Sequence, residues 1–110
     1  NGYSMMMSSH TLPVQVSTHV EAVIRIVRKY LPKETHSILL YGSWARAEAL
    51  PHSDIDVAIS GPTQIDFLTL ARIREELDDL PTLRKVDLVD LPSVGESLRR
   101  AILETHITLE

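Results

Sequence analysis

Apolar residues recur every three or four positions through residues 16–31, and this spacing predicts an amphipathic helix. The apolar positions are Val16, Val20, Val23, Ile24, Val27 and Leu31. Thr18 and Glu21 have the spacing of a capping box, so we expect the helix to begin near them. Pro32 ends it, because proline has no N–H to continue the helical ladder.

Three further segments are expected to be helical. Thr63 is a candidate cap for a helix that ends at Pro81. Its apolar side carries Phe67, Leu70, Ile73, Leu77 and Leu80. Ser93 and Glu96 form a second candidate capping box, which opens a last helix. The inward positions of that helix are Val94, Leu98, Ala101 and Ile102. Residues 43–49 contain alanine and glutamate, which are good helix formers, and predict a short helix broken at Pro51.

Three short apolar runs alternate with these helices and predict strands at residues 37–41, 54–60 and 84–90. The resulting order α-β-α-β-α-β-α indicates a layered α/β or α+β domain. The first two strands are about a dozen residues apart, which is near the lower limit for a parallel crossover. An antiparallel pair bridged by the short helix fits at least as well. We therefore expect a small mixed three-stranded sheet with helices on one face.

The 110 residues suffice for one domain, which we place at residues 13–110 behind a flexible tail at residues 1–12. The formal net charge of −4 argues against non-specific nucleic-acid binding, which needs a basic surface. The absence of cysteine excludes disulfides, thiolate metal sites and cysteine nucleophiles. No apolar run approaches the roughly 20 residues of a membrane span, and the N-terminus lacks the features of a signal peptide. We therefore expect a cytoplasmic protein with no membrane contact.

Candidate chemistry begins where the strand at residues 37–41 is expected to meet the short helix. Gly42 and Ser43 stand at this junction, where backbone N–H groups and the helix dipole favour an anion. Gly42 lets a phosphate approach the backbone, and the Ser43 hydroxyl adds a donor. Arg46 lies one helical turn further and can reach a phosphate with two parallel hydrogen bonds, although it is equally compatible with a surface position.

Acidic residues follow on the next two strands. Asp54 and Asp56 are two residues apart, so their side chains share one face of a strand. Two carboxylates held close together repel each other unless a hard cation such as Mg²⁺ or Mn²⁺ lies between them. The third acid is Asp87, because Val86 and Leu88 must face the core. Asp90 is better placed to end its strand and help the turn into the last helix.

Each of these features alone has an ordinary structural explanation. A Gly-Ser pair at a strand end is usually a turn, and paired aspartates are often a solvated edge. His52 is best explained as a solvated loop residue, and Trp44 and Tyr41, which flank the turn, as core or partner contacts. The combination at fixed spacing is what indicates a site.

Gly42-Ser43, ten residues and then Asp54-Ile55-Asp56 resembles the signature of the DNA polymerase β-like nucleotidyltransferase superfamily. The spacing and the acidic third strand resemble its smallest members, the minimal nucleotidyltransferases of bacteria and archaea. The resemblance implies the nucleotidyltransferase fold. It also implies that Gly42 and Ser43 bind the phosphates of ATP and that the three aspartates hold two divalent cations, Mg²⁺ or Mn²⁺. The family often has glycine where this chain has Ala47, a difference that is harmless if the segment is helical.

Members of this family often stand beside a HEPN-domain ribonuclease toxin and act as its antitoxin, some by transferring AMP to a toxin tyrosine. The resemblance therefore implies an enzyme that moves AMP from ATP to a tyrosine of a HEPN-type partner, with which it forms a hetero-oligomer. Other acceptors remain open: a small molecule, or an RNA end. A binding-only antitoxin that blocks its partner without catalysis is the alternative from a different class.

Overall fold

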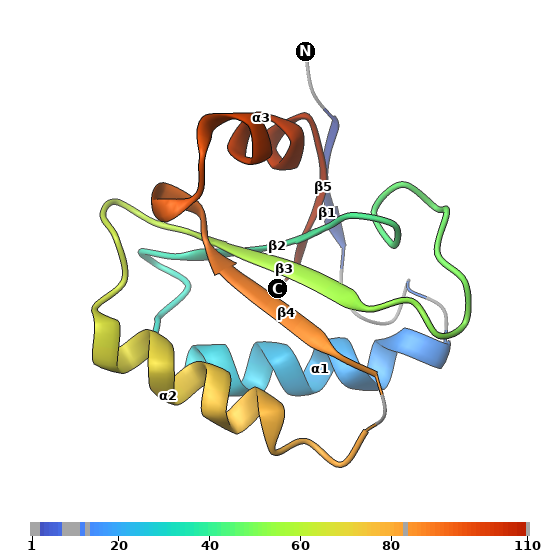
Figure 1. The fold of residues 1–110 in the computed structure, drawn as a ribbon, viewed down its shortest axis with the longest axis horizontal. Coiled ribbons are helices and arrows are strands. Elements are labelled where there is room, and N and C mark those ends of the chain that lie inside the picture. The colour runs from blue at the N-terminus through green and yellow to red at the C-terminus, as the bar shows by residue number, and fades with distance from the viewer. Residues whose placement is uncertain (1–2, 8–11, 13, 83, 110) are drawn as a thin grey trace.

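The computed structural model describes residues 3–7, 12, 14–82 and 84–109 of the chain (Figure 1). Its helices are α1 (Val14–Arg28), α2 (Phe67–Asp78) and α3 (Glu96–Glu104), with a short 3-10 helix, η2 (Leu91–Ser93). Its strands are β1 (Tyr3–Met7), β2 (Ser37–Tyr41), β3 (Ile55–Ser60), β4 (Val86–Asp90) and β5 (Thr105–Leu109). The expected strands at residues 37–41, 54–60 and 84–90 correspond to β2, β3 and β4 within two residues at each end.

The strands form one mixed sheet in the order β1-β5-β2-β3-β4. The central pair β2–β3 is antiparallel, which is one of the two arrangements that the short connection allowed, and β3–β4 is parallel. The mixed α+β class is therefore confirmed, but the three expected strands are five among the described residues. The missing two are β1 and β5, which pair in parallel, while β5 also runs antiparallel to β2.

The expected flexible tail is wrong for Tyr3–Met7, which forms β1. The other described residue of that stretch, Leu12, packs against the main core. The strand β5 was missed because it follows α3 directly, with no glycine or proline to mark the change from helix to strand. The domain boundary at residue 13 stays a prediction.

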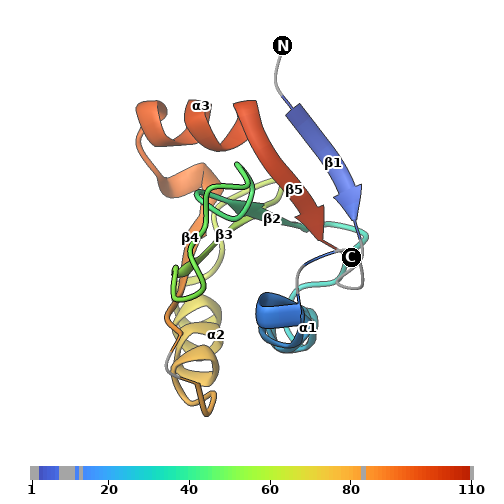
Figure 2. The same cartoon turned by 90° about the vertical axis from the view of Figure 1, so that its right-hand side faces the viewer.

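Helices lie on both faces of the sheet, not on one face as expected (Figures 1 and 2). The helices α1 and α2 cover one face and enclose the main core, which includes Val20, Val27, Leu40, Val57 and Ile73. The helix α3 lies against the other face, above a smaller apolar cluster. That cluster consists of Leu39, Ala58, Leu91 and Ile102. The second face also carries Asp56 of β3, which shares a face of the strand with Ala58 of this cluster, so α3 becomes a neighbour of the candidate site.

The three helices begin at residues other than the predicted caps. The helix α1 starts at Val14, which places Thr18 inside it. The helix α2 is capped by Asp66, whose carboxylate accepts hydrogen bonds from the N–H groups of Leu68 and Thr69 at 3.2 and 3.3 Å. Gly95 occupies the N-cap of α3, where Ser93 was expected. The apolar spacing located each of the three helices but did not identify their caps. Two residues expected on the apolar sides of α2 and α3, Phe67 and Leu98, are instead exposed.

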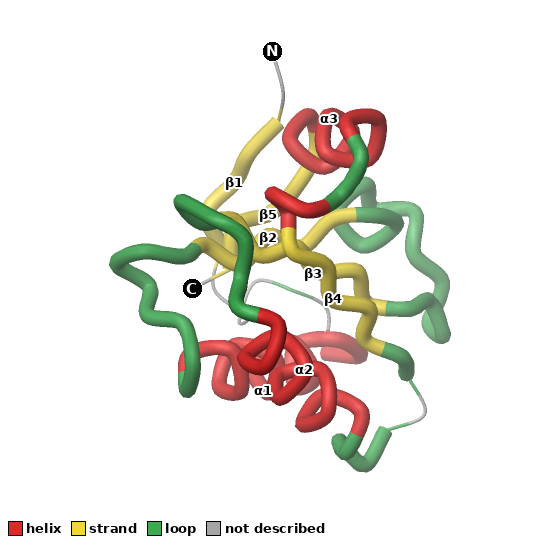
Figure 3. The backbone as a smooth tube through the Cα atoms, turned by 60° about the vertical axis from the view of Figure 1, so that its left-hand side comes forward, coloured by secondary structure: helices red, strands yellow, loops and turns green. Residues whose placement is uncertain are grey.

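The expected short helix at residues 43–49 is a series of turns, drawn as part of the loop between β2 and β3 in Figure 3. Gly42 and Ala47 have φ angles of 74° and 59°, in the left-handed region that a right-handed helix excludes. The turns are closed by hydrogen bonds from Arg46 N–H to Gly42 O and from Glu48 N–H to Ser43 O, at 3.1 and 2.9 Å. The view that Ala47 is harmless is therefore wrong, since it occupies a conformation that favours glycine.

None of the helices in the described part of the chain is long and apolar enough to cross a bilayer.

Candidate active site

The Gly42–Ser43 turn lies directly after β2 and packs against the carboxylate of Asp56 on β3. A β-carbon added to Gly42 would overlap Asp56 Oδ2 and lie 3.3 Å from Asp56 Cγ. Its φ of 74° also disfavours any residue with a side chain. Glycine is therefore required at position 42 for two reasons: the positive φ angle and the contact with the Asp56 carboxylate.

The acids of β3 and β4 face the same side of the sheet. Asp56 and Asp87 are register partners in the parallel pair β3–β4, which places their side chains on one face. Asp54 precedes β3 by one residue and Asp56 by two. Asp56 is half-buried, whereas Asp54 and Asp87 are exposed.

Burial, followed by the charges of Asp87 and Asp54, raises the pKa of the Asp56 carboxyl group above that of an ordinary aspartate. The positive charges of Arg46 and Lys85 oppose this shift in the pKa without cancelling it. The three aspartates are thus close enough to repel one another. A bound cation, or a positively charged group of a ligand, would relieve this repulsion.

A cavity of about 490 Å³ opens beside this cluster. Its lining includes Gly42, Ser43, Arg46 and Asp56, which are four of the six predicted site residues. Asp54 and Asp87 lie outside the lining. The structure thus joins the predicted phosphate-binding turn to the central acid of the predicted cluster in one open space.

Arg46 faces this cavity but is held by a neighbour. Its Nε lies 3.0 Å from Glu48 Oε1, and both side chains are more than half exposed. An exposed ion pair of this kind contributes only about 0.2–1 kcal/mol, so the guanidinium can leave Glu48 at small cost when an anion enters.

Two aromatic residues flank the turn and differ in role. Tyr41 lines the cavity and is the register partner of Asp56 across β2–β3. Burial, with the charges of Asp56 and Asp87, raises the pKa of Tyr41 to about 12, so its phenol stays protonated. Trp44 instead packs against the main core and donates its indole N–H to Ser53 O at 3.3 Å. Of the two expected positions for Trp44, in the core or at a partner interface, the structure shows the core contact.

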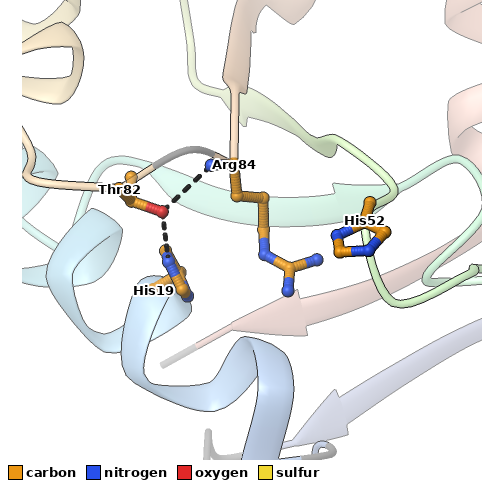
Figure 4. Close-up of a pocket in the computed structure, with 4 residues that line it drawn as sticks. All are labelled: His19, His52, Thr82 and Arg84. Atoms are coloured by element: carbon orange, nitrogen blue, oxygen red, sulfur yellow. Dashed lines mark hydrogen bonds between the residues drawn. The ribbon is translucent and has the colours of Figure 1, made fainter.

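His52 lies apart from the acid cluster, in a second pocket of about 270 Å³ (Figure 4). The other residues drawn there are His19, Thr82 and Arg84, and His19 Nε2 lies 2.6 Å from Thr82 Oγ1. His52 is exposed and does not line the cavity of Asp56. This position agrees with its interpretation as a loop residue.

Asp90 is a structural residue. It is buried, accepts a hydrogen bond from Ile65 N–H at 2.9 Å and accepts another from the Ser93 hydroxyl at 2.8 Å. It ties the end of β4 to the segments that lead into α2 and α3, which leaves Asp87 as the acid of β4 that faces Asp56.

Residues 21–109 match the family model described as "Polymerase beta, Nucleotidyltransferase". The chain belongs to the polymerase β nucleotidyltransferase family. The expected enzyme class, a nucleotidyltransferase, is therefore confirmed.

The nucleotidyltransferase has relatives among named proteins and solved structures. It is 25% identical over 89 residues to the probable protein adenylyltransferase MntA of Haemophilus influenzae, covering 81% of this chain and 77% of that one. It superposes with a TM-score of 0.65 on a crystal structure of a toxin–antitoxin with AMP-PNP, at 26% identity, covering 81% and 70% of the two chains. A tri-AMPylated Shewanella oneidensis HEPN toxin in complex with MNT antitoxin matches with a TM-score of 0.63. Its identity is 24%, over 86% of this chain and 71% of that one, so it shows the fold alone.

Within the described part of the nucleotidyltransferase, no three His, Cys, Asp or Glu side chains are grouped as ligands of one metal ion. The chemistry of the donor set nevertheless fits Mg²⁺ or Mn²⁺, because Asp54, Asp56 and Asp87 offer only carboxylate oxygens. The pKa of Asp56 is raised mainly by burial and then by the charges of Asp87 and Asp54, and this repulsion by the two neighbouring acids is a second observation in favour of a cation.

Sequence reasoning missed one wall of the cavity. Leu98, Ala101 and Glu104 of α3 and Thr105 of β5 line it together with the predicted residues. Leu98 was expected to point into the core, but it is 41% exposed. These residues are more than 50 positions from Gly42 along the chain, and no local pattern could connect them to it.

Proposed function

We propose that this nucleotidyltransferase transfers AMP from ATP, with the help of a divalent cation, to a tyrosine hydroxyl of a HEPN-type ribonuclease toxin, and that it thereby acts as an antitoxin. The observation that carries the proposal is the cavity in which Gly42, Ser43 and Arg46 meet Asp56. Phosphate donors and a metal-binding acid are both needed for nucleotidyl transfer, and here they face one space.

The triphosphate of ATP is assigned to the Gly42–Ser43 turn. Gly42 and Ser43 form the turn that lines the cavity, and the Ser43 hydroxyl and the Arg46 guanidinium are donors on the same wall. Arg46 exchanges Glu48 for phosphate, a stronger acceptor of paired hydrogen bonds.

The cation is assigned to Asp54, Asp56 and Asp87, and when bound it would neutralise charge on the triphosphate. Asp56 is the residue through which the acids reach the cavity, since it alone of the three lines it. Asp54 and Asp87 are exposed, and both lie close enough to Asp56 to raise its pKa after the larger effect of burial.

In the transfer step, the tyrosine oxygen of the acceptor attacks the α-phosphorus of ATP. A new P–O bond forms, the bond from the α-phosphorus to the bridging oxygen breaks, and pyrophosphate leaves. The phenolic proton passes to the carboxylate of Asp87, which is exposed toward an incoming protein. A phenol with a pKa near 10 needs such a base at neutral pH.

The partner is assigned on two grounds. One is the likeness to the toxin–antitoxin complex that holds AMP-PNP, and the other is the name protein adenylyltransferase carried by the Haemophilus influenzae relative. We infer a hetero-oligomer with the toxin. A cytoplasmic location for the pair stays a prediction from the sequence.

One observation favours a second candidate, a binding-only antitoxin. The three aspartates are not assembled as a ligand set among the described residues, which is what a chain without catalysis would also show. In that case the protein would cover its partner without modifying it.

Intact-mass spectrometry of the partner separates the two candidates. The toxin is incubated with ATP, Mg²⁺ and either the wild-type chain or the double variant Asp54→Ala/Asp56→Ala. A gain of one AMP that the double variant abolishes and that maps to a tyrosine supports transfer. Neutralisation of the toxin that survives in the double variant, with no mass change for the wild type, supports binding alone.

A further inference from the structure

The cavity beside Asp56 has two chemically different walls. One wall consists of the turn and the acid, with Ser43 and Arg46 as donors for an anion. The opposite wall is formed by Leu98, Ala101 and Glu104 of α3 and by Thr105 at the start of β5. The second wall has no role in the transfer chemistry described above.

The pairing of β5 with β2 sets the order of residues along this second wall. Leu40 is the partner of Ile107 in an antiparallel register, so the chain before Ile107 runs toward Gly42. Thr105 and Glu104 therefore lie at the end of the wall nearest the turn. Ala101 and Leu98 follow at intervals of three residues, or about 4.5 Å each along the helix.

A nucleotide whose phosphates lie at the turn must extend its sugar and base away from them. Its ribose then meets Glu104 and Thr105 first, and its base meets Ala101 and Leu98. The lining residues change from polar to apolar with distance from the turn, and the nucleotide changes in the same order from its sugar to its base. The apolar side chains suit the face of a base, and Leu98 is 41% exposed, so it is accessible to one.

The chemistry of Glu104 selects the ribose as its partner. A carboxylate accepts hydrogen bonds and cannot donate, so it repels phosphates and suits the hydroxyl groups of the sugar. Among the described residues, none forms an ion pair or hydrogen bond with the Glu104 side chain. Glu96 on the same helix, by contrast, is paired with Arg100 at 2.8 Å.

We infer that the wall formed by α3 and β5 is a ribonucleoside site in which Glu104 accepts a hydrogen bond from a ribose hydroxyl. The chain therefore prefers ribonucleotides to deoxyribonucleotides. This inference rests on the proposed function, because it takes the triphosphate to lie at Gly42 and Ser43.

Titration calorimetry on the full chain tests the inference without any acceptor protein. The probes are a non-hydrolysable ATP analogue and its 2′-deoxy and 3′-deoxy counterparts, each with Mg²⁺. Wild-type protein is expected to bind the ribonucleotide about tenfold tighter than one of the two deoxy forms, which is the size of one hydrogen bond to a charged group. In Glu104→Ala this ratio should fall to about twofold or less.

Glu96→Ala is the matched control, because it removes the same charge from the same helix outside the cavity. It should keep the full preference for ribose, and the melting temperatures of both variants verify that they fold. Equal affinities in the wild type, or a ratio that survives in Glu104→Ala, would overturn the inference and leave the proposed transfer standing. A wild-type chain that binds none of the nucleotides would overturn both.

Discussion

Gly42 and Asp56 are in such close contact that the carboxylate of Asp56 fills the space in which a β-carbon of residue 42 would lie. The contact joins the turn after β2 to the acid of β3, which are the two halves of the candidate active site. It explains why glycine at position 42 serves the site in addition to the turn. Any side chain there would move the one acid that reaches the cavity.

Gly42→Ala should therefore damage both folding and binding. The φ of 74° alone makes alanine unfavourable by about 1–2 kcal/mol, and displacement of Asp56 adds to that loss. Chemical denaturation gives the change in the free energy of unfolding, and titration with ATP and Mg²⁺ gives the affinity. Gly95→Ala is the control, because a β-carbon there meets no atom within 4 Å, and it should leave nucleotide binding unchanged. Equal nucleotide affinity in wild type and Gly42→Ala would contradict this account of the site.

Ala47→Gly should stabilise the protein. Ala47 has a φ of 59°, so glycine relieves left-handed strain of about 1–2 kcal/mol and gives back about 0.4–1 kcal/mol through the greater freedom of the unfolded chain. The net gain is about 0.5–1 kcal/mol, or a few degrees in melting temperature. Ala49→Gly, at a position without positive φ, should lower the melting temperature instead. A loss of stability in Ala47→Gly would show that the turn is not strained.

The comparison of Ala47 with Gly42 shows where sequence reasoning succeeded and failed. Gly42 was correctly expected at the end of β2, and Asp56 and Asp87 on one face, because these positions depend on strand period and on the register of neighbouring strands. Ala47 was misplaced because alanine favours helix locally, whereas the turn around it is set by Gly42 and by the return of the chain to β3. The connection from β2 to β3 therefore determines the conformation of Ala47, and the local helix propensity of alanine does not.

The edge of the sheet illustrates the same limit at longer range. The strand β1 pairs with β5, and the two are about 100 residues apart in sequence. Neither segment has strict alternation of apolar and polar residues, so neither was recognised as a strand from its own sequence. The pairing of β5 with β2, which also joins segments remote in sequence, carries Glu104 and Thr105 to the turn at Gly42, which is why that wall of the cavity was not predicted.

Asp56→Asn should stabilise the protein in the absence of ligands. The pKa of Asp56 is raised in the folded state, mainly by burial and then by Asp87 and Asp54, so the folded protein holds this proton more tightly than the unfolded chain does. Stability should therefore fall as the pH rises from the ordinary pKa of 3.8 through the raised pKa of the folded state, and the loss persists at neutral pH. Asparagine removes the charge and with it this dependence.

Melting temperatures of wild type and Asp56→Asn across the acidic range up to neutral pH measure this effect. The two curves should converge at low pH and separate as the pH rises, with the variant higher. Asp54→Asn serves as the comparison, since Asp54 is exposed and should give a smaller gain. A variant that melts below wild type at neutral pH would mean that the Asp56 carboxylate stabilises the fold.

Leu50 is the apolar residue most suited to anchor the protein partner. Trp44 is packed against the core and Tyr41 is half-buried beside Asp56, whereas Leu50 is 71% exposed. It lies on the loop between β2 and β3, four residues before Asp54, so an acceptor that reaches the acids passes over it. Leu50→Ser should weaken the complex with the toxin about tenfold, as expected for loss of an apolar anchor worth about 1–2 kcal/mol, and leave the melting temperature nearly unchanged.

Phe67→Ser is the matched control, because Phe67 is 80% exposed but begins α2, which packs on the opposite face of the sheet. Surface-plasmon measurements on both variants decide between the two faces. If Phe67→Ser weakens the complex and Leu50→Ser does not, the toxin binds away from the acids, and transfer to one of its tyrosines from this cavity is ruled out for that complex.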